Sequence, residues 1–184
     1  LPTAAMFASK RKKVIGVDIN QHAIDTINAG KIHIIEPELD TLVKTSVDLG
    51  FLEATTSPKP ADAFLIAVPT PFIEDKEQGS IPIPDLSFIK SAAKSVAGVL
   101  KKGNLVILES TSPVGTTAKM QQILKEERPD LFQNENNVYF AHCPERVLPG
   151  RIMMELVEND RIIGGLSTEA NNKTVEFYKT FVQG

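Results

Sequence analysis

The stretch Ala63-Phe64-Leu65-Ile66-Ala67-Val68 is a continuous apolar run that ends at Pro69-Thr70-Pro71. A run of this kind suits a strand that is covered on both faces, as in a parallel sheet flanked by helices. Similar short runs rich in Val and Ile recur at Val14 to Val17, Leu105 to Leu108, Val138 to Ala141 and Arg161 to Ile163. Longer amphipathic stretches separate these runs. The alternation predicts an α/β fold with a doubly wound, mostly parallel sheet.

The stretches between the apolar runs carry helix signals. From Asp85 to Lys102, apolar residues recur at three- and four-residue steps, and Asp85 is suited to cap the first turn. Ser112 and Pro113 predict the N-cap and first position of a helix that runs to about Glu127. Further helices are predicted just before Gly30, just before Gly50 and from Thr168 to Val182. The segment from Pro69 to Pro84 is predicted to be one long loop, and such loops are often functional.

Composition excludes several classes of protein. The 184 residues are 42% hydrophobic and 23% charged, which predicts one globular domain with a substantial core. The net charge of −3 argues against a nucleic-acid partner. We interpret the short basic run from Lys10 to Lys13 as the solvated end of a helix. No apolar run approaches the roughly 20 residues that span a bilayer, and the N-terminus has no signal-peptide pattern, so we expect neither a membrane partner nor secretion.

Cys143 is the only cysteine, so an internal disulfide and a Cys-rich metal site are both excluded. A reducing cytoplasm therefore fits the chain best. We interpret Cys143 as a packing residue rather than a nucleophile, because it lies at the end of an apolar run before Pro144. The histidines lack metal-ligand spacing, and we interpret His142 as packed or hydrogen-bonded; no metal is expected.

An acid follows the first apolar run directly, in Lys13-Val14-Ile15-Gly16-Val17-Asp18. In dinucleotide-binding folds, a carboxylate at the tip of the second strand accepts hydrogen bonds from an adenosine ribose hydroxyl. An aspartate at a strand end is also a common turn former or helix cap. The residue alone leaves both interpretations open.

Polar residues also follow two later runs. Val68 leads directly into Pro69-Thr70, and Leu105 to Leu108 leads into Glu109 to Thr117, a cluster of hydroxyl residues at a predicted helix start. Ordinary helix capping needs only Ser112, so the remaining hydroxyls favour a ligand site with free backbone donors.

A fourth run ends in the stretch from Ala141 to Gly150, where Glu145 and Arg146 stand side by side. Ligands of open α/β sheets bind at the carboxyl ends of the strands. We therefore expect four residues to share one rim of the sheet: Asp18, Thr70, Thr111 and Glu145.

These motifs resemble the UDP-glucose/GDP-mannose dehydrogenase family in order and over essentially the whole chain. The strings that carry the resemblance are Gly16-Val17-Asp18, Val68-Pro69-Thr70-Pro71, Ser110 to Gly115 and Cys143-Pro144-Glu145-Arg146. Three longer strings are similar to the UDP-N-acetyl-D-mannosamine dehydrogenase branch: Gly16 to Ala23, Cys143 to Gly150 and Asn159 to Gly165. The UDP-glucose branch has a second acid where this chain has Pro149, which also favours the mannosamine branch.

The resemblance implies a Rossmann-like NAD-binding domain of a cytoplasmic, homo-oligomeric enzyme. Such an enzyme oxidises the C6 alcohol of a UDP-sugar to a carboxylate with two NAD, for surface polysaccharide synthesis. The implied cofactor-binding residues are Asp18, Asn20, Val68, Pro69, Thr70, Ser110 and Thr111. Thr111 would hold a water at the reacting carbon and Glu145 would assist it, and the substrate would be bound by Glu145, Arg146, Val147 and Leu148.

The resemblance also marks what the stretch 1–184 lacks. The chain begins at Leu1-Pro2-Thr3, inside the helix that follows the family's first strand and Gly-rich loop. The family's nucleophilic cysteine lies beyond Gly184, with a linker helix and C-terminal domains. We therefore interpret 1–184 as a partial NAD-binding domain that is inactive by itself. Without the first strand, we expect Val14 to Val17 to pair with Ala63 to Val68 or another chain, or to be poorly ordered.

Two alternatives to this interpretation stay open. One is a UDP-glucose or GDP-mannose 6-dehydrogenase, which uses the same cofactor on a different sugar nucleotide. The other is a non-catalytic α/β module that binds a nucleotide without turnover.

Overall fold

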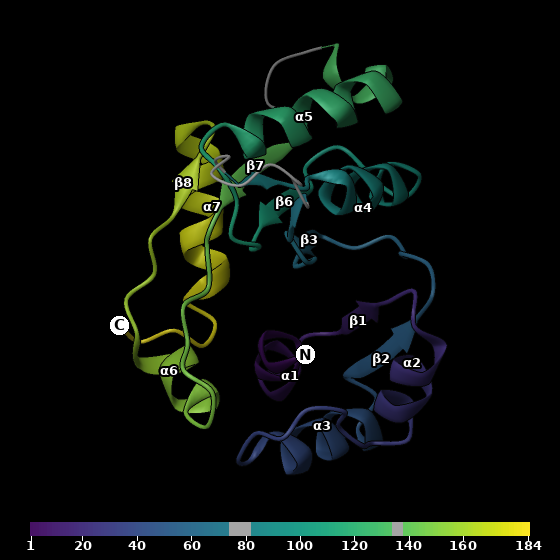
Figure 1. The fold of residues 1–184 in the computed structure, drawn as a ribbon, viewed down its shortest axis with the longest axis vertical. Helices are drawn as coiled ribbons and strands as arrows, with labels where there is room; N and C mark the ends of the chain where they lie inside the picture. Colours follow the sequence, from purple (N-terminus) through teal and green to yellow (C-terminus); the bar gives the residue numbers. More distant parts are fainter. Residues whose placement is uncertain (74–81, 134–137) are drawn as a thin grey trace. The chain divides into compact units, whose positions relative to one another are not determined.

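The computed structural model describes residues 1–73, 82–133 and 138–184. The chain divides into two compact units (Figure 1). Unit 1 comprises Leu1–Lys59, Arg146–Arg161 and Glu176–Gly184. Unit 2 comprises Pro60–Glu145 and Ile162–Val175.

Unit 1 consists of short helices around a pair of strands. Its elements are α1 (Pro2–Ser9), β1 (Val14–Val17), α2 (Gln21–Asn28), α3 (Leu39–Asp48), β2 (Leu52–Thr55) and α6 (Ile152–Glu158). The predicted helices before Gly30 and Gly50 are confirmed, and both glycines have the positive φ of a helix end, 68° and 74°. The basic run after α1 is exposed, as predicted for a solvated helix end.

Strand β1 pairs in parallel with β2, in the register Val14↔Leu52 to Val17↔Thr55. The prediction that β1 pairs with Ala63 to Val68 is therefore wrong. Its partner is a strand that was not predicted, because Leu52-Glu53-Ala54-Thr55 has only two buried apolar side chains and two more exposed polar ones. A short alternating strand of this kind gives a weak signal in the sequence.

The outer edge of β2 is covered by a side chain rather than by a strand. The Nδ2 of Asn28 donates to the carbonyl oxygen of Ala54 at 2.9 Å, and the backbone N–H of Ala54 donates to the Oδ1 of Asn28 at 2.8 Å. The amide of Asn28 thus makes the two bonds that a neighbouring strand would make. This arrangement satisfies the backbone of Ala54 at an otherwise open edge.

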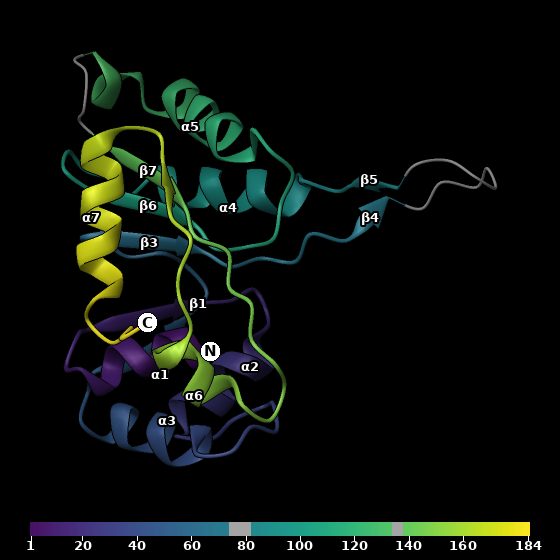
Figure 2. The same cartoon turned by 90° about the vertical axis from the view of Figure 1, so that its left-hand side faces the viewer.

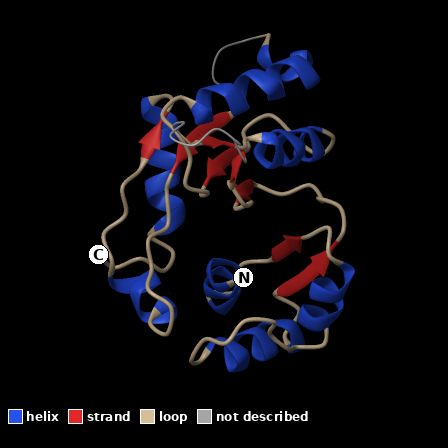
Figure 3. Cartoon of the chain, in the orientation of Figure 1, coloured by secondary structure: helices blue, strands red, loops and turns tan. Residues whose placement is uncertain are grey.

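Unit 2 is built on a four-stranded sheet with the order β3-β6-β7-β8. Figure 3 draws the strands in red. Its strands and helices are β3 (Ala63–Ile66), β4 (Phe72–Ile73), β5 (Ile83–Pro84), α4 (Ser87–Ala97), β6 (Leu105–Leu108), α5 (Thr116–Glu127), β7 (Tyr139–His142), β8 (Gly164–Gly165) and most of α7 (Thr168–Tyr178). Strands β3, β6 and β7 are parallel, and β8 runs antiparallel to β7. The predicted α/β fold with a mostly parallel sheet is confirmed.

The core of unit 2 lies between this sheet and helices α4 and α5. Every residue of β6 is buried, as the predicted interior strand requires. Side chains from both helices pack with the sheet in one cluster, including Ile89 and Met120, which are 2% and 0% exposed. The burial of both sides of β6 makes this strand the centre of the unit.

Several element boundaries differ from the predictions. The last strand is Gly164–Gly165 instead of Arg161 to Ile163, and α7 ends at Tyr178 instead of Val182. Helix α5 begins at Thr116, because the N–H and the hydroxyl of Thr116 both donate to Pro113 O and close a turn before the helix. Helix α4 ends at Ala97 instead of Lys102.

The predicted long loop from Pro69 to Pro84 contains a short antiparallel strand pair. Phe72 pairs with Pro84 and Ile73 with Ile83. Residues 74–81 lie outside the described part of the chain. Figure 2 shows β4 and β5 apart from the four-stranded sheet of unit 2.

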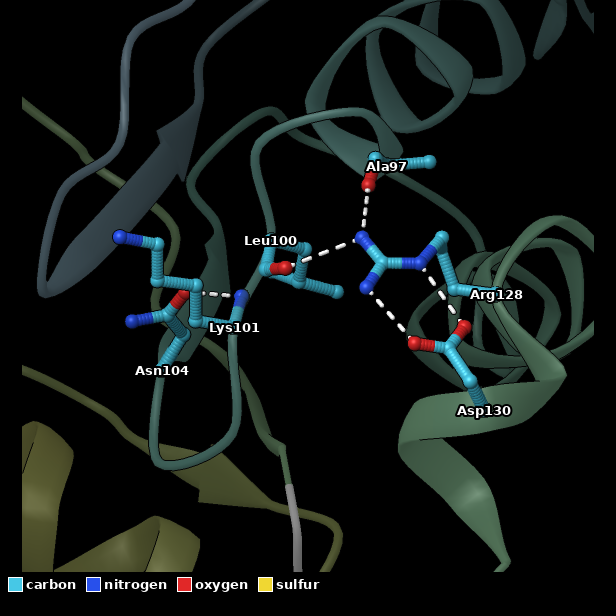
Figure 4. A network of polar contacts seen from close by, with 6 residues as sticks. All are labelled: Ala97, Leu100, Lys101, Asn104, Arg128 and Asp130. Atoms are coloured by element: carbon cyan, nitrogen blue, oxygen red, sulfur yellow. Dashed lines mark hydrogen bonds and ion pairs between the residues drawn. The ribbon is translucent and has the colours of Figure 1, made fainter.

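The end of α4 is held by a side chain from the end of α5 (Figure 4). The Nη1 of Arg128 donates to the carbonyl oxygens of Ala97 at 2.8 Å and Leu100 at 3.0 Å. The Nε and Nη2 of Arg128 donate to Asp130 at 2.9 and 2.8 Å. The bond from Arg128 holds the pKa of the Asp130 carboxyl below its ordinary value. The guanidinium therefore binds carbonyl oxygens at and just after the end of α4.

Candidate cofactor and substrate site

Three parallel strands of unit 2 end at the same edge of the sheet, because β3, β6 and β7 run in one direction. The segments after β3 and β6 are joined there by side-chain hydrogen bonds. The hydroxyl of Ser110 donates to Val68 O at 2.7 Å and accepts from Val68 N at 2.8 Å. The hydroxyl of Thr70 donates to Thr111 O at 2.7 Å. The structure therefore brings Val68, Thr70, Ser110 and Thr111 together.

These bonds distinguish the hydroxyls that hold the backbone from those available to a ligand. The hydroxyls of Ser110 and Thr70 are engaged with backbone groups. Thr111 is exposed, and its hydroxyl has no hydrogen-bond partner within the described residues. Pro69 is exposed between the two joined segments. Thr111 thus offers an exposed hydroxyl at this edge to a ligand or a water.

The end of β7 contributes a histidine with one ring nitrogen engaged. The Nδ1 of His142 lies 2.8 Å from Leu108 O, which also accepts the N–H of Cys143 at 3.0 Å. Because a carbonyl oxygen only accepts, Nδ1 carries the proton and Nε2 of the neutral ring is an acceptor. The interpretation of His142 as hydrogen-bonded is confirmed. Cys143 is 0% exposed, which confirms it as a packing residue.

Two acids accompany this edge. Glu145 follows β7 by three residues and is half-buried. Glu109 follows β6 directly and is only 7% exposed, and it was not predicted as a site residue. Its signal in the sequence is the one used for Asp18, an acid directly after an apolar strand. A buried carboxylate beside the hydroxyls makes this edge more polar than was predicted.

In unit 1, Asp18 lies directly after β1 and is exposed. Its Oδ1 accepts the N–H of Asn20 at 2.8 Å, and the Oδ1 of Asn20 accepts the N–H of His22 at 3.0 Å. Asn20 is therefore the N-cap of α2, a structural role that was not predicted for it. The Oδ2 of Asp18 has no partner in the described ranges, so this carboxylate fits the hydroxyl donors of a ribose.

The loop after Glu145 belongs to unit 1 from Arg146 onward. Arg146 and Leu148 are exposed and Val147 is half-buried. No ion pair of Arg146 occurs within the part of the chain that the structure describes. An unpaired guanidinium in this loop suits an anionic group such as a phosphate.

The predicted site residues are divided between the two units. Val68, Pro69, Thr70, Ser110, Thr111 and Glu145 lie in unit 2, whereas Asp18, Asn20, Arg146, Val147 and Leu148 lie in unit 1. The shared rim is therefore observed only within unit 2, for Thr70 and Thr111. That Asp18 shares this rim stays a prediction.

Metal-ligand clusters and membrane spans are both absent from the described residues. In ranges 1–73, 82–133 and 138–184, no group of three or more His, Cys, Asp or Glu residues is placed to hold a metal ion. Over the same ranges, no helix has both the length and the apolar character needed to cross a membrane.

A parallel α/β sheet with hydroxyls and acids at its strand ends is typical of α/β proteins that bind nucleotides. Within that class, the model for the UDP-glucose/GDP-mannose dehydrogenase family, NAD binding domain, matches residues 1–182. The chain belongs to this family.

Two relatives within this family are similar to the chain over its whole length. The chain is 58% identical to the UDP-N-acetyl-D-mannosamine dehydrogenase of Escherichia coli, over all of this chain and 44% of the relative. It is 56% identical to the NDP-N-acetyl-D-galactosaminuronic acid dehydrogenase of Ralstonia nicotianae, over all of this chain and 43% of the relative. The chain thus spans less than half the length of these relatives.

The structure of the UDP-D-ManNAc dehydrogenase from Pyrococcus horikoshii is similar to this chain in fold. It superposes with a TM-score of 0.91 at 45% identity, over all of this chain and 42% of that one.

Proposed function

We propose that residues 1–184 form the cofactor-binding part of an NAD-dependent UDP-N-acetyl-D-mannosamine 6-dehydrogenase. The observation that carries the proposal is the joined pair of strand ends in unit 2, where the Thr70–Thr111 bond leaves the Thr111 hydroxyl exposed. The 58% identity to a mannosamine enzyme supports the choice of sugar. The product would be the uronic acid used for surface polysaccharides, made in the cytoplasm.

NAD supplies the electron acceptor for this oxidation when it is bound. Asp18 accepts hydrogen bonds from the adenosine ribose, and Asn20 supports it by donating its N–H to the same carboxylate. Val68, Pro69, Thr70 and Ser110 form the wall that the cofactor contacts. The exposed carboxylate in unit 1 and the joined segments in unit 2 support this proposed division of roles.

The chemistry on the substrate side is assigned to two residues. Thr111 holds a water through its exposed hydroxyl, and Glu145 takes up or returns a proton of that water. Arg146 binds the diphosphate of the sugar nucleotide, with Val147 and Leu148 beside it.

We also infer the doubly wound order for the whole sheet. Among the described strands, β1 pairs only with β2, and β3 pairs in the sheet only with β6, so both keep an open edge. A further strand that pairs with both edges would complete the order and would bring the family's Gly-rich phosphate loop with it. Residues 1–184 are then a partial NAD-binding domain of a homo-oligomeric enzyme.

The full-length protein that contains residues 1–184 tests the function directly. Formation of NADH is measured with UDP-N-acetylmannosamine, UDP-N-acetylgalactosamine, UDP-glucose and GDP-mannose. We expect kcat/KM for the mannosamine substrate to exceed the others by roughly 10-fold or more, as a site that hydrogen-bonds its substrate discriminates. Equal or faster turnover of UDP-glucose, or no turnover of any of the four, would contradict the proposal.

A residue test accompanies this assay. Thr111→Val should lower kcat by about 10² because it removes the hydroxyl that holds the water, whereas Thr111→Ser keeps the hydroxyl and should retain most activity. Residues 1–184 alone should show no micromolar affinity in a calorimetric titration with NAD. Tight binding by this stretch would show that a Gly-rich loop is not needed for affinity.

The second candidate is an NDP-N-acetyl-D-galactosaminuronic acid dehydrogenase. The observation that favours it is the 56% identity to the Ralstonia relative, which nearly equals the identity to the mannosamine enzyme. Both sugars carry an N-acetyl group, so this group does not distinguish the two candidates. The four-substrate assay distinguishes them by comparing UDP-N-acetylmannosamine with UDP-N-acetylgalactosamine.

The alternatives of a glucose or mannose substrate have weaker support. A UDP-glucose dehydrogenase structure from Pyrobaculum islandicum is 28% identical to this chain. A binding module without turnover would give no NADH with any of the four substrates.

A further inference from the structure

The loop from Arg146 to Arg151 is held by its backbone, and the bonds come from side chains elsewhere in unit 1. The N–H of Leu148 donates to Oε2 of Glu155 at 2.9 Å, and the Nδ2 of Asn159 donates to Arg146 O at 3.4 Å. Both of these side chains belong to α6 or its end. The third anchor comes from a distant part of the sequence.

That third anchor is Glu36, in the segment between α2 and α3. Its Oε2 accepts the N–H of Gly150 at 2.8 Å, and its Oε1 accepts the N–H of Ile152 at 2.7 Å. Glu36 is only 5% exposed, while its neighbour Ile35 is fully exposed at 102%. In this segment the carboxylate is therefore buried and the apolar side chain is exposed. Hydration of the two groups favours the opposite arrangement.

Glu36 does more than cap a helix. Ile152 opens α6, so its N–H is one of the donors that a helix start leaves unpaired. Gly150 lies outside the helix, at φ 84°, in the loop itself. Each carboxylate oxygen accepts one of the two donors, so a single buried side chain fixes both the loop and the helix that follows it.

The two long side chains of the loop, Arg146 and Leu148, are exposed. Leu148 is 60% exposed, and Arg146 is exposed with no ion pair in the described part of the chain. A loop whose backbone is anchored inward while its long side chains stay outside is suited to present those side chains to a ligand.

We propose that Glu36 is a positioning residue for recognition of the nucleotide sugar, acting through the loop that carries Arg146 and Leu148. This inference rests on the proposed function, because it assigns those side chains to the substrate. Replacing the carboxylate by an amide removes one of the two acceptor oxygens and places an NH2 donor against a backbone N–H, so the loop loses one anchor and relaxes. Binding of the sugar nucleotide weakens, whereas Thr111 and Glu145 of unit 2 keep their own contacts.

The test compares Glu36→Gln with Glu38→Gln in the full-length protein. Glu38 lies two residues away and is exposed, so the control makes the same change outside the anchor. We expect Glu36→Gln to raise KM for UDP-N-acetylmannosamine roughly 10-fold, with kcat within about 2-fold of wild type and KM for NAD unchanged. The KM of Glu36→Asp should lie between those of wild type and Glu36→Gln. The kinetic constants of Glu38→Gln should match those of wild type.

Several results would overturn the proposal. One is that Glu36→Gln has the same KM as the wild-type enzyme, measured with a sugar nucleotide that the wild-type enzyme turns over. That result would overturn the role of Glu36 and leave the proposed function intact. Another is a loss of kcat and of NAD affinity as large as the rise in KM, which would show a general structural role.

If Glu36→Gln does not fold, Glu155→Gln replaces it, because it releases only the N–H of Leu148. This variant should raise the same KM by a smaller factor, and an unchanged KM would overturn the proposal. If the wild-type protein turns over none of the four sugar nucleotides, a calorimetric titration with UDP decides. Weaker binding by Glu36→Gln than by wild type then supports the anchor, and equal or absent binding contradicts it.

Discussion

Unit 1 and unit 2 differ in what satisfies the polar groups of their backbones. In unit 2, side chains such as Ser110 and Arg128 also bind backbone groups, but the strands are paired in a four-stranded sheet whose strand β6 is buried along its whole length. In unit 1, the sheet has only two strands, and two side chains each satisfy a pair of backbone groups. Asn28 pairs with Ala54, and Glu36 pairs with Gly150 and Ile152.

The difference shows where each unit is vulnerable. A unit that rests on a buried sheet loses stability when apolar volume is removed from that sheet. A unit that rests on a few polar side chains loses stability when one of them is removed, because each one satisfies two backbone groups. Substitutions of the two kinds should therefore act in different units.

The largest effect is expected for Leu108→Ala in β6. Leu108 is 0% exposed, and its truncation should lower the free energy of unfolding by about 2–5 kcal/mol. Denaturant titration measures this, with Val114→Ala as the control because Val114 is 105% exposed. Amide hydrogen exchange should rise mainly in peptides of unit 2. An equal rise in unit 1 would break the comparison, since the two units would then open together.

Asn28→Ala makes the matching test in unit 1. It should cost about 1–2 kcal/mol because both backbone groups of Ala54 lose their partner. Exchange of the Ala54 amide should accelerate, while amides of β6 stay protected. Gln21→Ala on the same helix removes only an exposed bond to Asp25 and should leave stability unchanged. An Asn28 variant as stable as that control would show that water replaces the amide at no cost.

Gly115→Ala tests a backbone position of unit 2. Gly115 precedes α5 at φ 88°, and a Cβ there should cost about 1 kcal/mol. Gly98→Ala is the matched control, because Gly98 has φ −63° and an added Cβ would meet no neighbouring atom within 4 Å. The control should gain about 0.4–1 kcal/mol through the unfolded chain. Thermal unfolding of both variants measures the difference, and equal shifts would contradict it.

The smallest effect is expected at Asp130. Arg128 lowers the pKa of Asp130 in the folded chain, so the pair stabilises unit 2 above the ordinary carboxyl pKa of about 4. That contribution is lost as the pH falls through the lowered pKa. Asp130→Asn should therefore flatten the acid side of a plot of unfolding midpoint against pH, and Arg128→Met should flatten it too. If both variants have the same pH dependence as wild type at acid pH, the ion pair does not contribute to the stability of unit 2.

Much of the candidate site follows from local patterns. Asp18, Thr70, Thr111 and Glu145 were predicted because each follows an apolar run, and parallel strands end at one edge. The bond between Thr70 and Thr111 agrees with that reasoning within unit 2. Glu109 obeys the same rule but was overlooked among the hydroxyl residues that follow it.

Other features had no local pattern to predict them. The strand Leu52–Thr55 is too short and too polar to be recognised from the sequence. Ser112-Pro113 has the pattern of a helix start, but a turn closed by Thr116 precedes the helix. A turn of this kind competes with the helix start through its own hydrogen bonds, and helix propensities do not include those bonds.

By itself, the sequence determined the α/β class, the fully buried strand β6 and the helix ends at Gly30 and Gly50, because hydrophobic period and glycine conformation act over a few residues. Only the tertiary structure decided that Asn28 covers the edge of β2 and that Glu36 anchors a loop 114 residues further along the chain. The physical reason is that the buried carboxylate of Glu36 is stable only beside its donors, and the buried backbone groups of Ala54 only beside their partners. Which donors those are depends on how distant segments pack.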